Sequence, residues 1–277
     1  MRFFLVIDAD GLAFKSYYAL EQKVDYPMAF GVLRSVVKIL NDFEPDRLAL
    51  VFDSDDEELK RIYPGYRRGR EEPWDLGMED YVYMLEILAG LGFKVYKNGR
   101  EADRIIAGLV NTNEDDEICI YSDDKDFFQL LEGQRIWMFG EHRGEVFCSD
   151  VVREFELPRG QCGLFRELLI FTGDPVDRVP RILRTADAYE VIWRKGYLED
   201  WFFDEDFEGL PQRIQDILVE KFDEIVRNYR LVNLMDETKA GLYKRTFGDE
   251  KLGEILEKVG LSEGDVGRAL EWISILR

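Results

Sequence analysis

The sequence is poor in the residues that carry thiol and imidazole chemistry. Its 277 residues include a single histidine, His142, in the polar stretch "GEHRGE", and three cysteines, Cys119, Cys148 and Cys162, at no metal-ligand spacing. A zinc site and a Ser–His or Cys–His nucleophile are therefore disfavoured. The odd cysteine number fits reduced thiols in a cytosol-like compartment.

Long hydrophobic runs and a glycine-rich phosphate loop are missing as well. The opening run "FFLVID" ends at Asp8, so it is too short for a signal-peptide core or a membrane span, and no membrane partner is expected. With 46% hydrophobic residues, the chain can still bury a sizeable core in one large domain or two smaller ones.

Basic residues are outnumbered, which gives a formal charge of −20 and argues at first against a nucleic-acid partner. Their distribution points the other way, because they gather in two groups. The groups are Lys60, Arg61, Arg67, Arg68 and Arg70, and Arg178, Arg181, Arg184, Arg194 and Lys195. An anion would meet either patch locally, although each could equally be an ordinary solvated face.

The first half alternates strand-like and helix-like segments, which predicts an α/β fold with a mainly parallel sheet covered by helices. The expected strands are Phe3–Asp8, Arg47–Asp53, Phe93–Tyr96, Glu117–Tyr121 and Arg135–Phe139. Between them, "MAFGVLRSVVKIL", "YVYMLEILAGL" and "ADRIIAGLV" carry apolar residues at helical spacing.

After about residue 150 the strand pattern fades and helices are expected at Gln161–Thr172, Ala186–Lys195, Gln212–Asn228 and Lys251–Val259. We therefore expect an α/β domain over residues 1–150 and a helical subdomain over 151–277. The charged segment from Glu57 to Asp75 reads as a loop too polar for the core, and loops of that length are usually functional or disordered.

The stretch "YSDDKDFF" places Asp123, Asp124 and Asp126 around Lys125. Carboxylates this close raise one another's pKa unless water, a cation or a proton screens them. Taken alone, the stretch could be a helix start or a solvated turn, because Asp favours N-caps and first turns. The other acidic residues decide between these readings and a metal site.

Sites in parallel sheets form at the carboxyl ends of the strands. Acidic residues stand at or just beyond such ends, and a further pair lies in "FTGDPVD" after an apolar helix. The set is Asp8, Asp53, Glu101, Asp103, Asp124, Asp126, Asp174 and Asp177. Oxygen-only ligands select hard cations such as Mg²⁺ or Mn²⁺, and two such ions can clamp a phosphodiester.

Six ordered motifs add a family resemblance. The stretches "VIDADGLAFKSYYAL", "LVFDSD", "YPGYRRGR", "GREADRIIA", "YSDDKDFFQLL" and "FTGDPVDRVP" are similar to those of the 5′→3′ exonuclease and flap endonuclease family. That family includes the N-terminal nuclease domains of bacterial DNA polymerase I and phage enzymes that remove RNA primers. The likeness covers roughly residues 3–195.

The resemblance implies a PIN-like nuclease domain with a helix-three-turn-helix-like subdomain. It makes the eight carboxylates metal ligands, with Asp174 and Asp177 at the second metal, and it leaves out Asp123, where relatives often have a small residue. The segment 57–75 becomes a basic arch whose Arg67 and Arg70 face the scissile phosphate. Nucleic-acid contacts are implied for Lys15, Lys60, Arg61, Arg68, Arg181 and Arg184.

The same resemblance implies an activity and its partners. The expected enzyme hydrolyses phosphodiesters at 5′ ends or 5′ flaps of DNA and RNA/DNA hybrids, with two Mg²⁺ ions that Mn²⁺ could replace. It would act as a monomer in a bacterial or phage-infected cytoplasm, with replication proteins such as a single-strand-binding protein or a clamp as further partners.

Several positions depart from the family pattern. Arg104 replaces a usual acidic residue near the metals, and Arg67 stands where relatives commonly have Lys, which leaves a phosphate clamp but not proton transfer. Arg181, Arg184 and Ala186 occupy about the positions of glycines that let the backbone approach duplex phosphates. We therefore expect either weaker binding of duplex DNA or contacts to its phosphates from side chains in place of the backbone.

Two alternatives stay open at this point. A protein of the same fold that binds branched DNA without cutting it would fit Arg104 and the altered turn. A haloacid-dehalogenase-like phosphatase would explain "IDAD" and "GDPVD", but it leaves Asp53, Glu101, Asp103 and the basic segment unused. A metal-dependent cleavage assay on a 5′-flap substrate separates all three.

Overall fold

The computed structural model describes residues 2–237 and 239–276. Contacts divide them into two compact units, each built from separate stretches of sequence. Among the described residues, the first unit contains 2–55, 71–122 and 239–276, and the second contains 56–70 and 123–237. Within this part of the chain, no helix is both long and apolar enough to cross a membrane.

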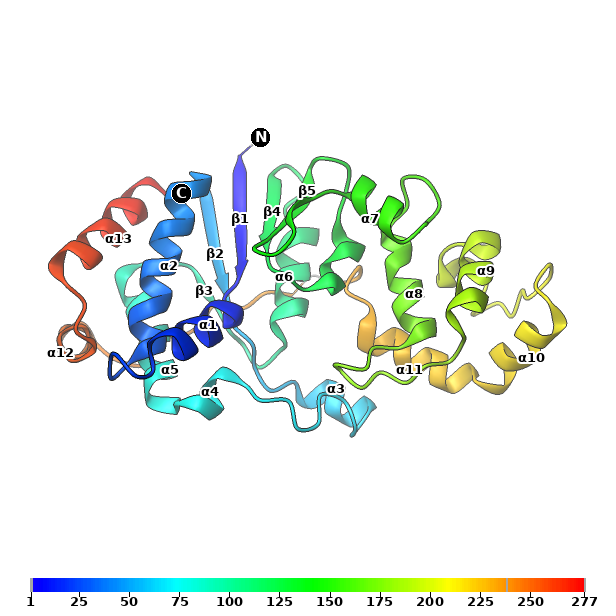
Figure 1. Ribbon diagram of the computed structural model, residues 1–277, viewed down its shortest axis with the longest axis horizontal. Helices are drawn as coiled ribbons and strands as arrows, with labels where there is room; N and C mark the ends of the chain where they lie inside the picture. Colours follow the sequence, from blue (N-terminus) through cyan, green and yellow to red (C-terminus); the bar gives the residue numbers. More distant parts are fainter. Residues whose placement is uncertain (1, 238, 277) are drawn as a thin grey trace. The chain divides into compact units, whose positions relative to one another are not determined.

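The first unit contains four parallel strands among its described residues, in the order β3-β2-β1-β4 (Figure 1). Its elements are β1 (Phe3–Asp8), α1 (Asp10–Leu20), α2 (Pro27–Phe43), β2 (Arg47–Val51), α4 (Pro73–Leu76), α5 (Met78–Leu91), β3 (Val95–Tyr96), α6 (Ala102–Asn111), β4 (Glu117–Tyr121), α12 (Asp249–Val259) and α13 (Glu263–Ile275). The strands are almost wholly apolar and buried, as expected for parallel strands covered by helices. The predicted fold class is thereby confirmed.

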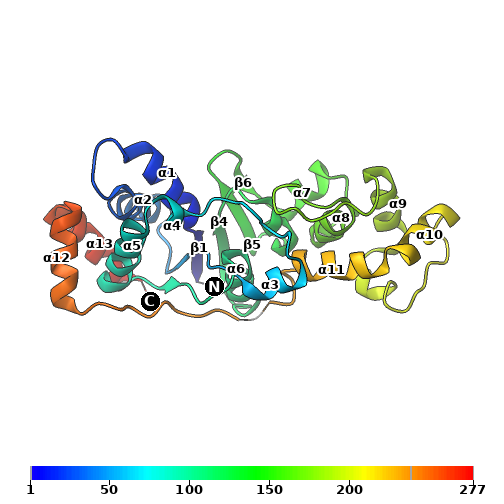
Figure 2. The ribbon, with the colours of Figure 1, turned by 90° about the horizontal axis from the view of Figure 1, so that it is seen from below.

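Buried carboxylates fasten parts of this unit together. The Asp80 carboxylate accepts hydrogen bonds from the N–H groups of Met28 and Ala29, which lie in the first turn of α2 and lack helical partners. Glu86, in the buried face of α5, accepts hydrogen bonds from the extended segment that precedes α12, which Figure 2 shows as an orange stretch. It accepts from the Tyr243 hydroxyl, from the N–H and hydroxyl of Thr246, and from the Phe247 N–H.

The second unit is mainly helical. Its elements are α3 (Glu57–Ile62), η1 (Lys125–Leu130), β5 (Ile136–Gly140), β6 (Gly144–Val146), α7 (Cys148–Glu154), η2 (Cys162–Leu164), α8 (Phe165–Thr172), α9 (Thr185–Lys195), η3 (Leu198–Asp200), α10 (Gln212–Glu220) and α11 (Phe222–Val232). Strands β5 and β6 form an antiparallel pair. Helix α8 packs against α9 and α11, which leaves the turn from 173 to 184 as the connection between α8 and α9.

The structure corrects several expectations about local elements. The segment 57–75 is not one continuous loop, because it contains α3 and most of α4, and its Leu59 and Tyr66 are buried. The helix expected over Gln212–Asn228 is two helices that meet at Lys221. Strand β6 and helix α13 were not predicted, since β6 has three residues and neither shows a strong apolar pattern.

The expectation of reduced thiols is wrong for two of the three cysteines. Cys148 and Cys162 form a disulfide with a Cα–Cα distance of 5.3 Å, while Cys119 is a buried thiol. The bond joins the first residue of α7 to the first residue of η2, which leads into α8. Sequence spacing alone does not specify such a pairing.

We predict that Glu86→Gln destabilises the first unit by about 2–3 kcal/mol, because the amide would place a donor against N–H groups that now meet a carboxylate. Burial works to raise the pKa of Glu86, but its hydrogen bonds outweigh burial and lower the pKa from its ordinary 4.5. The stabilisation is therefore complete above about pH 4.5 and is lost as the pH falls through the lowered pKa. Urea unfolding from pH 3 to pH 7 measures both effects. Glu257→Gln, on the exposed face of α12, is the control and should change neither.

Candidate metal centre and the residues around it

Four of the predicted ligands lie at the carboxyl edge of the parallel strands in the first unit. Asp8 ends β1 and accepts a hydrogen bond of 2.9 Å from the Ser122 hydroxyl. Asp53 follows the neighbouring strand β2, and its carboxylate accepts a bond of 2.9 Å from the Ala102 N–H at the start of α6. Glu101 and Asp103, which flank Ala102, are thereby brought to the same edge, and both are buried.

A buried cluster that sequence reasoning missed supports Asp53. The Asp10 carboxylate accepts from the Asp53 N–H and, at 3.2 Å, from the Tyr81 hydroxyl. The Lys97 ammonium donates to the Asp53 carbonyl and, at 3.3 Å, to the Tyr81 hydroxyl, and it lies 4.6 Å from the centre of the Trp74 ring. The backbone of Asp53 is thus held on its N–H side by a carboxylate and on its C=O side by an ammonium.

The charges in this cluster shift one another's pKa. Burial, and then the nearby Asp53 carboxylate, raise the pKa of Asp10 from 3.8 to about 7, although its hydrogen bonds and Lys97 act in the opposite direction. Burial lowers the pKa of Lys97, while Asp10 and Asp53 favour its charged form. Burial and Asp10 raise the pKa of Tyr81, so the phenol stays protonated and remains a donor.

The other four predicted ligands lie in the second unit. Asp124 and Asp126 begin η1, and the Asp124 carboxylate accepts a bond of 2.9 Å from the Asp126 N–H. The helix-start reading of Asp124 is therefore correct as far as local structure goes. Burial raises the pKa of Asp124, and Asp177 adds to this rise, whereas the Asp126 N–H and the guanidinium groups of Arg67 and Arg70 oppose it.

Asp174 and Asp177 stand in the tight turn after α8. The turn is closed by paired backbone hydrogen bonds between Asp174 and Val179, and the Asp174 carboxylate accepts a bond of 2.7 Å from the Val176 N–H. Gly173 is required here, since it has a φ of 71° and an added Cβ would lie 2.4 Å from the Val179 carbonyl oxygen.

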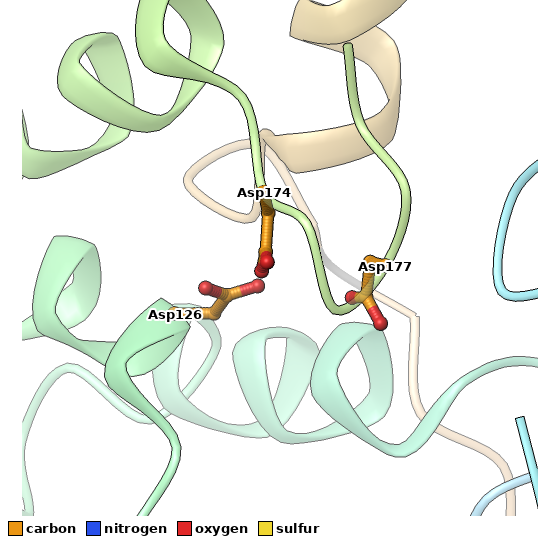
Figure 3. A group of neighbouring side chains, drawn as sticks. All are labelled: Asp126, Asp174 and Asp177. Carbon is orange, nitrogen blue, oxygen red and sulfur yellow. The ribbon is translucent and has the colours of Figure 1, made fainter. Parts of the chain in front are cut away.

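The described residues bring three of these carboxylates together as a potential cation site. Asp126, Asp174 and Asp177 each offer an oxygen, and these oxygens all lie within 4.8 Å of one another. Figure 3 shows the Asp126 side chain reaching toward Asp174, with Asp177 further along the same loop. Such an oxygen-only donor set fits a hard divalent cation.

Two arginines of the segment 57–75 contact this turn. The side chains of Arg67 and Arg70 both reach Asp177. The exposed basic residues of the second unit include Lys60, Arg61, Arg68, Arg181 and Arg184, and Lys15, in α1, is exposed in the first unit. Arg104, in α6, is buried. Besides Gly173, the turn holds Arg178 in the left-handed region, with a φ of 59°. Arg184 has an ordinary φ of −69°, so a glycine is not needed at position 184.

Comparison with known proteins identifies the family. Residues 3–155 match the model of the 5′-3′ exonuclease N-terminal resolvase-like domain, so the chain belongs to this family. Among curated relatives, DNA polymerase I of Streptococcus pneumoniae R6 is 25% identical over 97% of this chain and 34% of its own length. DNA polymerase I of Mycobacterium bovis is 24% identical over 83% of this chain and 27% of its own length. The chain thus spans about a third of the length of these relatives.

Solved structures share the fold. The T5 D15 protein crystallised with metal ions has a TM-score of 0.71 and 18% identity, with 99% of each chain covered. The T5 5′-exonuclease with bound zinc has a TM-score of 0.68 and 17% identity, covering 99% of this chain and 98% of its own. The catalytic core of Rad2 in complex with DNA has a TM-score of 0.57 and 19% identity, covering 98% of this chain and 92% of its own.

We predict that Asp10→Asn removes a pH-dependent loss of stability. In metal-free buffer, a carboxyl whose folded pKa is raised from 3.8 to about 7 stabilises fully below pH 3.8 and loses that contribution as the pH rises through 7. The amide can still accept from the Asp53 N–H. Between pH 5 and pH 8 the wild type should therefore lose about 2 kcal/mol relative to the variant. Urea unfolding measures this difference, with the exposed Asp115→Asn as the control. Parallel pH curves for wild type and Asp10→Asn would contradict the prediction.

Proposed function

We propose that this chain is a divalent-cation-dependent nuclease that hydrolyses phosphodiesters at 5′ ends or 5′ flaps of DNA and RNA/DNA hybrids. The observation that carries the proposal is the Asp126, Asp174 and Asp177 cluster, with Arg67 and Arg70 beside it, in a chain of the 5′-3′ exonuclease family. Family membership also removes the haloacid-dehalogenase alternative. The non-cutting alternative is decided by the assay below.

The chain's own residues suit such a reaction. Asp126, Asp174 and Asp177 would hold one cation, and the carboxylates at the strand ends, Asp8 and Asp53 with Glu101 and Asp103, would hold a second. Mg²⁺ is the expected ion, with Mn²⁺ as a substitute, and bound ions would supply a metal-bound water nucleophile and charge stabilisation at the phosphate. Arg67 and Arg70 would bind the phosphate oxygens, because a guanidinium pairs with them bidentately.

The remaining expectations follow from this proposal. The substrate is DNA with a 5′ flap or free 5′ end, and the place of action is a cytoplasm that holds replicating DNA, either bacterial or phage-infected. Contacts with a single-strand-binding protein or a clamp, the monomeric state, and the division into domains at residue 150 stay predictions. The acidic surface would weaken non-specific binding to nucleic acid, so that affinity depends on the local basic groups.

The decisive experiment is single-turnover cleavage of a 5′-flap oligonucleotide. We expect cleavage in Mg²⁺, none in EDTA, and a loss of about a hundredfold or more in Asp126→Asn, because a cation ligand is removed while carboxylate repulsion is relieved. The matched control is Asp123→Asn in the same stretch, whose carboxylate accepts from the His142 N–H instead. Wild-type protein that binds the flap in Mg²⁺ without cutting it would favour the non-cutting alternative. Equal rates in Asp126→Asn and wild type would remove the metal assignment.

Substitutions of Arg67 and Arg70 should affect the cleavage rate, whereas substitutions of Arg181 and Arg184 should affect DNA affinity. Arg67→Ala or Arg70→Ala should lower the cleavage rate more than the affinity, since negative charge on the phosphoryl oxygens grows in the transition state. Arg181→Ala and Arg184→Ala should mainly weaken binding and reduce the salt slope by about 1 each. Equilibrium binding at several salt concentrations, beside single-turnover rates, measures the difference. Arg153→Ala serves as the control, because this exposed arginine pairs with Asp150 on α7. Wild-type rates in the first two variants would exclude a role for Arg67 and Arg70 at the reacting phosphate.

A further inference from the structure

Two turns of the second unit are joined at one carboxylate. The N–H of Arg67 donates to the backbone carbonyl of Asp177 at 3.2 Å. The Nε of Arg67 and the Nη1 of Arg70 lie 3.1 and 3.2 Å from the same Asp177 oxygen, Oδ1. The Arg67 and Asp177 side chains are only 7% and 9% exposed, so this is a largely desolvated ion pair and not a surface contact.

The backbone at this junction is strained on both sides. Arg67 has a φ of 44° and Arg178, next to Asp177, has a φ of 59°. Both are bulky residues in the left-handed region, which persists only where surrounding contacts hold it. The contacts to Asp177 therefore hold the turn 65–70 in a conformation that it would not adopt on its own.

A second anchor holds the preceding part of the segment by different means. Helix α3 packs against α11, and the Arg227 guanidinium lies 4.8 Å from the centre of the Tyr63 ring. This anchor involves none of the three clustered carboxylates. A cation at the cluster would therefore act on the turn 65–70 while leaving the attachment of α3 in place.

Asp177 has two competing uses. One of its oxygens belongs to the three-carboxylate cluster, and Oδ1 is already engaged by two guanidinium groups. A divalent cation and two guanidinium groups at a single poorly solvated carboxylate repel one another. Binding of the cation must therefore weaken the pairing of Asp177 with the arginines, and by linkage the pairing must weaken binding of the cation.

We propose that Asp177 is a positioning residue shared between the cation and the two arginines, so that cation binding loosens the hold on Arg67 and Arg70 and makes them available to a phosphate. This role rests on the proposed nuclease function. It sets an order of events in which the cation binds before the guanidinium groups engage the substrate. Until then, Asp177 keeps both groups paired and the turn 65–70 in its strained form.

Calorimetric titration with Mn²⁺, without nucleic acid, tests the competition. Arg67→Ala and the more exposed Arg70→Ala should each bind Mn²⁺ about tenfold more tightly than the wild type, since a charge-assisted hydrogen bond to Asp177 no longer competes. Arg68→Ala is the matched control, because this exposed arginine lies between them and removes the same charge. It should tighten binding by about twofold at most.

The Asp177→Asn background separates competition from general electrostatics. There, adding Arg67→Ala should change Mn²⁺ affinity no more than adding Arg68→Ala does. Hydrogen exchange gives an independent readout. In the wild type, Mn²⁺ should speed exchange of the Arg67 N–H about threefold or more while leaving residues 57–62 of α3 unchanged, and it should have no such effect in Asp177→Asn.

The outcomes distinguish this proposal from the proposed function. If Mn²⁺ binds and the flap is cut, but Arg67→Ala, Arg70→Ala and Arg68→Ala alter Mn²⁺ affinity equally, the shared role of Asp177 is wrong and the nuclease assignment stands. Slower exchange of the Arg67 N–H on Mn²⁺ binding would also overturn the shared role. If no Mn²⁺ binds and no flap is cut, both proposals fail together.

Discussion

Repulsion between neighbouring carboxylates is the constraint on which the arrangement of both units depends. Several of the acidic groups near the strand ends and in the turn after α8 have a positive or partly positive neighbour. At Asp53 and Asp124 the neighbour is a backbone N–H at a helix start, and at Asp177 it is a pair of guanidinium groups. These donors offset the repulsion between the carboxylates, so that the chain can fold with the acidic groups close together. A cation that binds the carboxylates would either replace these donors or bind beside them.

Much of the fold follows from periodicity alone. Strands β1, β2 and β4 are apolar runs bounded by polar residues, and the parallel arrangement follows from their alternation with helices. The short strand β6 and the break between α10 and α11 at Lys221 depend instead on tertiary packing. Strand β6 has three residues and α10 has nine, and segments this short do not specify their own bounds. The polarity of the segment 57–75 concealed α3, because Leu59 and Tyr66 are buried among many charged residues.

The parts of the candidate site that could be predicted are the acidic residues that recur at strand and helix ends. Contacts between residues far apart in the sequence could not be predicted. Eight acidic residues at strand or helix ends could be picked out one by one, and three of them meet in one cluster. The cluster of Asp10, Tyr81 and Lys97 could not be predicted. These residues lie in α1, in α5 and just after β3, and no sequence spacing connects them. The alternating acids of "IDAD" were the one available hint. Pairing of Asp177 with Arg67 likewise spans 110 positions.

The discontinuous first unit has a consequence for how the protein is made. Its helices α12 and α13 pack on α5 and α2, and the Glu86 carboxylate meets N–H groups more than 150 positions later. A nascent chain therefore emerges from the ribosome with the faces of α2 and α5 that α12 and α13 later cover still exposed, while residues 123–237 of the second unit are synthesised. Contacts of such long sequence separation form slowly. The first unit must therefore finish folding after its C-terminal helices have been translated, and until then part of the apolar surface of α2 and α5 stays uncovered.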